Sequence, residues 1–416
     1  MEDGYFTINI KHKDITQTGR WCMVLRNKDR NYVYETMYGD SITSHKWPCV
    51  KGKTYYIDLS DSYGASKQAY ELVVTQTADP NWEREENDNQ EAATPLACDS
   101  PMNGMVENEG SDWFKLETPA AAGYVTFSLV HPDIAEKGGW TMTIQDASGK
   151  VYGKYNGSSI NTIKYGFAPG TILYIKLTAN YGDDRQLYTL TASFTPSVTF
   201  ESEPNDSAAN ADSIAYNTDY CGVINSSADD VDYYSFTNPA AGKVTIHFGP
   251  VDISNTGKWN LTLVDASGNE TSLLQTETTQ DVTSLLKKGT YYLKITDSWG
   301  ASNKDYTFRL SRKNYNISGK TKIQKAKLSR KHIIKYIKLG KRAKNAEKYL
   351  VKISRKKNMS DASSAEFNAV KKLDIDYYGY YKTTYYIQVR PYVTDAFDNR
   401  WYGKKSNIVK IKTKRL

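Results

Sequence analysis

The chain has 416 residues, of which 39% are hydrophobic and 12% aromatic, so it can form three or four domains with buried cores and is not a disordered chain. No apolar run approaches the roughly 18 residues that cross a bilayer, so we expect no transmembrane segment. Four cysteines exclude a disulfide scaffold. Residues 317–416 carry a net charge of +20 and residues 1–316 a net charge of −13, so two chemically distinct regions meet near residue 316.

The region before residue 316 contains an internal repeat. A tryptophan recurs every 119 residues and a tyrosine every 118 residues, at Trp21, Trp140 and Trp259 and at Tyr70, Tyr188 and Tyr306. A period of this length corresponds to a whole domain rather than to a solenoid unit. We therefore divide the chain into a first copy (residues 1–77), a second copy (80–196), a third copy (198–313) and a C-terminal module (317–416).

The first copy is shorter than the other two. In the second copy 40 residues separate Glu83 from Gly123, whereas only three residues precede the equivalent Gly4. The repeat alignment thus predicts that about 37 residues of a complete first copy are not in this sequence, and that the chain is a piece of a longer polypeptide.

The three copies have the pattern of β-strands. In YVTFSLV from Tyr124 and KVTIHF from Lys243, apolar and polar residues alternate as they do in half-buried strands. Turn residues such as those at 146–149 and 265–268 separate the strands, and no long helical pattern occurs. The sequence therefore predicts an all-β protein made of tandem, jelly-roll-like β-sandwich domains.

Acidic residues cluster at the start of the second and third copies. The third copy begins with ESEPND at residues 201–206, and DDVD follows at residues 229–232. The second copy has EREEND at residues 83–88, followed by Asp112. So many carboxylates repel one another unless water or a cation lies between them. Ca²⁺, which takes about six to eight oxygen ligands, suits that need.

The spacing of the third-copy residues supports this interpretation. Residues i and i+2 of an extended chain point the same way, so Glu201, Glu203 and Asn205 present three oxygens to one side. Asp230 and Asp232 offer two more. The alternative is that Asn205 and the following aspartate only cap a turn.

At these residues the sequence resembles the bacterial pre-peptidase C-terminal domain. The hallmarks of that family stand at residues 201–206, 230–236, 259–268 and 289–295 of the third copy. The second copy departs from the family pattern, with Glu86 in place of the proline and Gly110 opposite Asp230. The resemblance covers roughly residues 1–313 and implies non-catalytic β-sandwiches appended to secreted bacterial peptidases and other exoenzymes.

The resemblance also implies metal ligands, because the related collagen-binding domains hold Ca²⁺ through the leading acidic segment and the aspartate pair. In the third copy the implied ligands are Glu201, Glu203, Asn205, Asp206, Asp230 and Asp232, with Asp229 adjacent. In the second copy they are Glu83, Glu85, Asn87, Asp88 and Asp112.

The C-terminal module breaks the repeat. Alternating segments such as KTTYYIQVRPYV from Lys382 resemble the Lys-rich, fibronectin type III-like, immunoglobulin-fold domain that ends many secreted proteins of Gram-positive bacteria. That family usually has a tryptophan where this chain has Tyr336. A module of charge +20 suits an anionic cell-wall polymer, and no motif indicates specific nucleic-acid binding. The alternative is a solvated lysine-rich surface.

No catalytic constellation is evident. The five histidines lack metal-ligand spacing, and neither H-E-x-x-H nor G-x-S-x-G occurs. Rings beside glycine turns, at Tyr63, Tyr181 and Trp299, are candidates for stacking on a sugar or a peptide, or else for folding over their own sandwich edge. We expect a monomeric set of extracellular or cell-surface modules that bind a protein or polysaccharide. The alternative is the accessory region of a secreted peptidase whose catalytic domain lies upstream.

Overall fold

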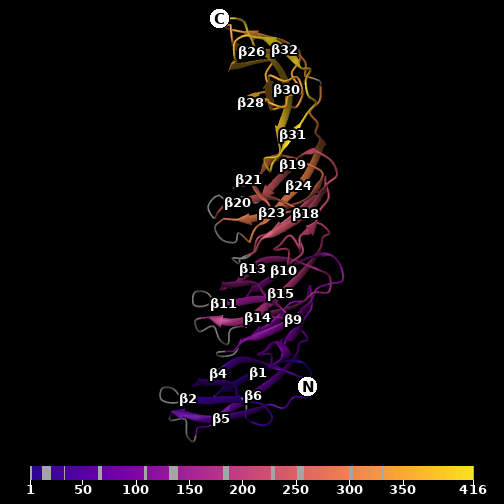
Figure 1. Cartoon of the computed structure of the whole chain (residues 1–416). Helices are drawn as coiled ribbons and strands as arrows, with labels where there is room; N and C mark the ends of the chain where they lie inside the picture. The colour runs from indigo at the N-terminus through magenta and orange to yellow at the C-terminus, as the bar shows by residue number, and fades with distance from the viewer. Residues whose placement is uncertain are drawn as a thin grey trace.

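A computed structural model of the chain shows an almost entirely β architecture, with sandwiches that follow one another in a row from the N-terminus to the C-terminus (Figure 1). The structure describes residues 2–11, 20–31, 33–63, 68–106, 110–130, 139–180, 187–225, 230–250, 257–298, 303–319, 321–329 and 331–415. Among them the single helical element is the 3-10 turn η1 (Gln90–Ala92). The predicted all-β fold class is confirmed.

The second copy is a sandwich of two mostly antiparallel sheets, with the orders β13-β10-β15-β8 and β12-β11-β14-β9-β7. Its strands are β7 (Thr94–Leu96), β8 (Met102–Met105), β9 (Asp112–Glu117), β10 (Gly123–Val130), β11 (Gly139–Asp146), β12 (Val151–Gly157), β13 (Ile160–Phe167), β14 (Ile172–Asn180) and β15 (Leu187–Pro196). The predicted alternation holds in β10, where Val125, Phe127 and Leu129 face the core. Trp140, the repeated tryptophan, is fully buried in the same core.

The third copy repeats this architecture strand for strand. Its sheets have the orders β16-β18-β23-β20-β21 and β17-β24-β19-β22. The strands are β16 (Asp212–Ser213), β17 (Asp219–Val223), β18 (Asp232–Asn238), β19 (Gly242–Pro250), β20 (Trp259–Asp265), β21 (Glu270–Thr276), β22 (Gln280–Leu286), β23 (Gly289–Asp297) and β24 (Asp305–Asn314). Trp259 is again fully buried in the core.

The first copy has only six of these strands among its described residues. They are β1 (Gly4–Lys11), β2 (Arg20–Arg26), β3 (Val33–Gly39), β4 (Ile42–Cys49), β5 (Tyr56–Tyr63) and β6 (Glu71–Ala78). They form two three-stranded sheets, β4-β1-β6 and β3-β2-β5, around a small core that contains Trp21 and Trp47. No counterparts of β7, β8 and β9 therefore occur in the part of the first copy that the structure describes.

The C-terminal module is a further sandwich of two sheets, outside the repeat. One sheet has the order β25-β26-β29, and the other has β28-β27-β30 with both β31 and β32 on β30. The strands are β25 (Ile323–Leu328), β26 (Ile333–Leu339), β27 (Lys348–Ser354), β28 (Ser363–Asn368), β29 (Lys372–Tyr378), β30 (Thr384–Thr394), β31 (Arg400–Tyr402) and β32 (Val409–Lys412). Tyr349 and Tyr385 are nearly fully buried in its core.

The junctions between the copies also repeat. Tyr5 of the first copy packs against Trp82 at 4.4 Å between ring centroids, and Tyr124 of the second copy packs against Phe200 at the same distance, each with tilted rings. A lysine amine lies over the tyrosine ring at both junctions. Trp82 and Phe200 stand directly before the acidic segments of the second and third copies. We call these acidic stretches, residues 83–88 and 201–206, the leading segments, and each is held against the copy that precedes it.

Candidate metal centres

The leading segments dock in the same way in the second and third copies. In the second copy the backbone N–H of Glu83 donates to the Asn103 carbonyl (2.9 Å), and the Asn87 carbonyl accepts from the N–H of Trp113 (3.0 Å). The third copy repeats the first of these bonds from the N–H of Glu201. Both segments thus run in extended form between β8 and β9, or between β17 and β18.

Because the leading segments are extended, alternate side chains point to the same side, as predicted. Glu201, Glu203 and Asn205 are 2%, 7% and 0% exposed, while residues 202, 204 and 206 lie nearer the surface. The second copy shows the same alternation, with its buried members 1%, 2% and 0% exposed: Glu83, Glu85 and Asn87.

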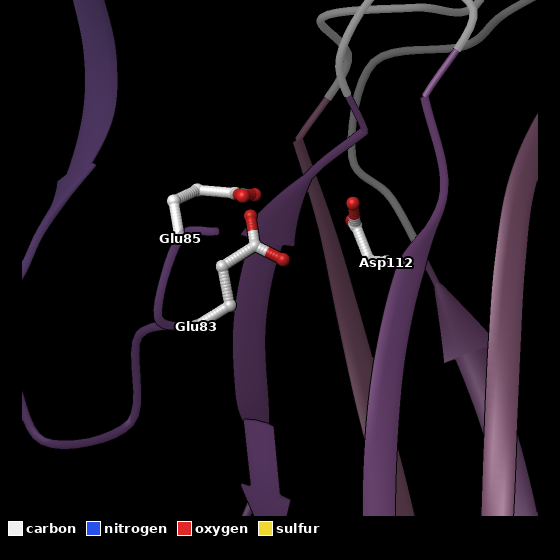
Figure 2. A group of neighbouring side chains, drawn as sticks. All are labelled: Glu83, Glu85 and Asp112. Carbon is white, nitrogen blue, oxygen red and sulfur yellow. The ribbon is translucent and has the colours of Figure 1, made fainter. Parts of the chain in front are cut away.

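The buried acids of the second copy meet an aspartate from the neighbouring strand. Ligand oxygens of Glu83, Glu85 and Asp112 all lie within 4.8 Å of one another. Figure 2 shows the carboxylates of Glu83 and Glu85 pointing toward each other from the leading segment, with Asp112 facing them from the start of β9. We call this group the second-copy centre.

A tyrosine completes the second-copy centre. The Tyr188 hydroxyl lies 2.6 Å from Glu83 Oε2 and 2.5 Å from Asp112 Oδ2, and the other Glu83 oxygen accepts from the Met105 N–H (2.6 Å). A hydroxyl has one proton to donate, so Tyr188 cannot satisfy both carboxylates at once.

The third copy contains two overlapping acidic groups. Oxygens of Glu201, Glu203 and Asp232 form the equivalent buried group, which we call the third-copy centre. A second group, nearer the surface, combines Glu203 with Asp206 and Asp230. Glu203 is therefore shared, and Asp230 lies with the outer group rather than with the inner one.

Two tyrosines face the third-copy centre. Glu201 Oε2 accepts from the hydroxyls of Tyr234 (3.0 Å) and Tyr306 (3.1 Å), and Tyr306 also contacts Asp232. The position of Tyr234 in β18 is taken in β9 by Phe114, so the second-copy centre has one hydroxyl fewer.

Several oxygens in the centres, or on the asparagine that follows their glutamates, have no hydrogen-bond partner among the described residues. They are the amide oxygens of Asn87 and Asn205 and, in the third copy, Glu203 Oε1 and Asp232 Oδ1. Each of these side chains is at least nine-tenths buried. A buried acceptor without a partner is costly, so the arrangement fits an occupant that accepts lone pairs.

Burial raises the pKa of the acids in both centres. Desolvation, followed by the charge of Asp230, raises the pKa of Glu201 to about 8. Desolvation also raises the pKa of Asp230 to about 7 and that of Asp112 to about 6. The same cause raises the pKa well above the ordinary value for Glu83, Glu203 and Asp232. These sites therefore resist ionisation in the absence of a counter-charge.

The outer group lines a cavity of about 220 Å³ at the junction of the second and third copies. Asp206 and Asp230 face Lys150 and Tyr152 of the second copy across it. Asp206 is ion-paired with Lys150 at 3.0 Å, so a cation in the outer group competes with that lysine for Asp206.

Most of the predicted metal ligands lie together in these groups, and some predicted site residues do not. Asp88 lies outside the three acidic groups, and the rings of Tyr63, Tyr181 and Trp299 lie outside the described residues, as does Asp229. The sequence analysis missed the tyrosines of the centres, although the 118-residue spacing of Tyr188 and Tyr306 marked them as repeated positions.

A known family model matches part of the chain. Residues 235–307, which run from β18 into β24, match the family described as a secretion system C-terminal sorting domain. This match indicates a secreted or surface protein. No curated protein matches the chain. Within the described part of the chain, no helix has the length and apolar character of a membrane span.

Several solved structures resemble parts of the chain. The pre-peptidase C-terminal domain of a collagenase from Bacillus anthracis is 21% identical, covering 24% of this chain and 94% of that one, with a TM-score of 0.20. A β-1,2-glucanase from Parabacteroides distasonis is 14% identical over 43% of this chain and 28% of that one, with a TM-score of 0.19. The chicken CNTN1 FN1–FN3 domains are 11% identical over 72% of this chain and 97% of that one, with a TM-score of 0.22.

Proposed function

We propose that residues 1–313 are non-catalytic, calcium-stabilised β-sandwich modules of a secreted or surface protein. The observation that carries the proposal is the pair of buried centres in equivalent places of two copies. In each, three carboxylates converge beside an asparagine oxygen that has no partner among the described residues. A structural cation satisfies these oxygens and balances their charge.

The donor set favours Ca²⁺ over other cations. All candidate ligands are oxygens, and Ca²⁺ binds carboxylate and amide oxygens at about 2.3–2.6 Å with flexible geometry. One ion at that distance can contact oxygens up to about 5 Å apart, and those of each group lie within 4.8 Å of one another. Mg²⁺ prefers a stricter octahedron and keeps several waters, whereas transition metals favour nitrogen or sulfur ligands.

Burial argues against a catalytic role for these acids. Glu201 and Asp232 are 2% and 0% exposed and lie against core tyrosines, so a polymeric substrate does not reach them. A general acid or base has to contact the reacting group. The centres therefore stabilise the fold, and binding of a partner takes place at the outer surfaces of the modules.

We further propose that the modules tether or space their parent protein at an extracellular protein, a polysaccharide or an anionic cell-wall polymer. The support is the charge division of the chain and the row of sandwiches seen in Figure 1. A role as the accessory region of a secreted peptidase is compatible with the same features. The sequence encoded upstream of residue 1 distinguishes the two, because a peptidase signature there decides for the second.

Calorimetry of the full chain, with a chelator and then with excess Ca²⁺, tests the calcium proposal. Binding to the folded state alone stabilises by about 2.7 kcal/mol at a hundredfold excess over Kd, so the melting temperature should rise. Asp232→Asn should abolish the third-copy part of that rise, whereas Asp219→Asn, at an exposed carboxylate, should leave it intact. An unchanged melting profile in millimolar Ca²⁺ contradicts the proposal.

A further inference from the structure

The first copy exposes residues that the other copies bury. Tyr70, just before β6, and Leu72 and Val74 on it are 51%, 39% and 44% exposed. Their equivalents are nearly or fully buried: Tyr188, Leu190 and Ala192 in the second copy, and Tyr306, Phe308 and Leu310 in the third. An apolar row of this kind is unusual on a solvent-exposed strand.

The strand register establishes this equivalence. Leu72 pairs with Ile10 across β1 and β6, as Leu190 pairs with Leu129 across β10 and β15. Tyr70 also keeps its place, because its ring meets Trp21 edge-on at 5.1 Å as Tyr188 and Tyr306 meet their own tryptophans. The first copy therefore has the normal inner surface without its normal cover.

The second and third copies show what the cover is. There, β15 pairs with β8 and β24 with β17 on the edge that β6 leaves unpaired among the described residues. Likewise, β14 pairs with β9 and β23 with β18 on the edge that β5 leaves unpaired. The same segment supplies core residues, including Leu96, Met102 and Phe114 in the second copy.

We propose that the edges of β6 and β5 form a docking surface for a polypeptide segment built like residues 81–117. Such a segment brings two strands with alternating apolar residues and a leading Glu-x-Glu-x-Asn motif. It places a glycine against the Tyr70 hydroxyl, as Gly104 lies against Tyr188. The bound segment turns Tyr70 into part of a third carboxylate–tyrosine centre.

The geometry favours a segment that enters from the N-terminal side of β1 in the same polypeptide. In the second copy only residues 118–122 separate β9 from β10, so a short link suffices. A segment from another molecule of this chain would have to leave its own sandwich, where it provides buried core residues. This inference concerns strand pairing and stands apart from the calcium proposal.

The test fuses residues 81–120 of this chain to Glu2 of the full chain, since Gly4 and Gly123 are equivalent. Amide hydrogen exchange is then measured with a chelator in every sample, so that failure of the calcium proposal does not affect the result. The exchange of backbone amides in residues 69–72, the equivalents of the β15 residues that pair with β8, should slow by about tenfold or more relative to the unfused chain. Unchanged exchange overturns the proposal.

A matched variant and a concentration series complete the test. In the second copy a β-carbon on Gly104 would lie 2.5 Å from Tyr188 Cζ, so Gly104→Val in the fused segment alone should restore fast exchange of residues 69–72. If the valine variant protects these residues equally well, the docking mode is wrong. If residues 69–72 of the unfused chain become protected as its concentration rises, another molecule of the chain is the occupant and the proposal fails.

Discussion

Gly222 lies where the acids and tyrosines of the third-copy centre approach the backbone most closely. A β-carbon there would lie 2.6 Å from the Tyr234 hydroxyl and closer still to Glu201 and Tyr306. Gly222→Ala should therefore destabilise the third copy by roughly 1–3 kcal/mol, because the core has no room to relax. Chemical denaturation measures this. Gly289→Ala, whose β-carbon would have no neighbour nearer than 3.5 Å, is the control and should have little effect.

The raised pKa values predict how stability depends on pH. The pKa of Glu201 is about 8 and that of Asp230 about 7 in the folded chain, both above their ordinary values of 4.5 and 3.8. Between those limits the folded state binds more protons than the unfolded state, so stability without metal should fall as pH rises from about 5 to about 8.

Ca²⁺ should reverse this trend because it replaces the bound protons. Its affinity should increase by about tenfold per pH unit for each carboxyl that must ionise. The gap between melting temperatures with Ca²⁺ and with chelator should thus widen from about pH 5 to about pH 8. A gap that stays constant over that range would show that the buried acids do not bind the ion.

At this scale the sequence predicted which residues share one side of the segment, but not that this side is buried or which residues meet there. Alternation along an extended segment placed Glu201, Glu203 and Asn205 on one side, and the structure shows that this side is buried. The same alternation does not predict that Asp230 lies beside Asp206, because that contact depends on where β18 begins and on the neighbouring copy. The pairing of Asp206 with Lys150 is a contact between copies that no spacing within one copy encodes.

At the scale of elements, the hairpin between β30 and β31 docks the C-terminal module onto the third copy. Phe397 stacks on Tyr291 of β23 at 6.0 Å, and the Ala396 N–H donates to the Leu285 carbonyl (3.3 Å). Thr271 also donates to the Ala396 carbonyl (3.0 Å). The contact between these oppositely charged regions therefore combines a ring pair and hydrogen bonds to the backbone with one ion pair, between Lys287 and Asp395 at 3.9 Å.

Phe397→Ala should loosen this junction without unfolding either domain. The substitution removes a ring pair worth roughly 0.5–1.5 kcal/mol together with its buried area. NMR relaxation or X-ray scattering should then show independent reorientation of the C-terminal module, while the circular dichroism spectrum stays the same. Tyr402→Ala, in β31, is a suitable comparison because that ring packs on Tyr392 and lies under Arg390, both in its own module. Equal effects of the two variants would contradict the docking role.

Strand patterns predicted the sandwiches but not this hairpin contact. The alternation of β30 specifies a buried face within its own module, where Tyr385 and Ile387 lie in the core. The turn that follows reads as an ordinary polar connection, with Asp395 and Asp398. Phe397, the apolar residue of this turn, has a stacking partner only because Tyr291 of the third copy lies next to the turn.

For the whole molecule, the lysines of the C-terminal module are the feature that points to a partner. Lys338 of β26 stands directly opposite Lys325 of β25 and Lys372 of β29, and all three are exposed. Like charges in directly opposite positions weaken a sheet. Asp374 offsets part of this repulsion through its ion pair with Lys372 (2.8 Å), and the remaining positive charge is what the proposed anionic ligand would contact.

This row of lysines predicts salt-dependent binding of an anionic polymer such as teichoic acid or heparin. The full chain should be retained on a heparin column at low salt and released as salt rises, because exposed charges are screened beyond roughly 8 Å at physiological ionic strength. Combined Lys325→Gln, Lys338→Gln and Lys372→Gln substitutions should lower the salt needed for release. Three equivalent changes at exposed lysines of the turn after β27 and of the C-terminal strand, Lys356→Gln, Lys357→Gln and Lys412→Gln, should lower it less. If both variants elute together, only net charge matters and the row is not a binding site. If the unmodified chain passes through at low salt, the module is a solvated surface and anchors nothing.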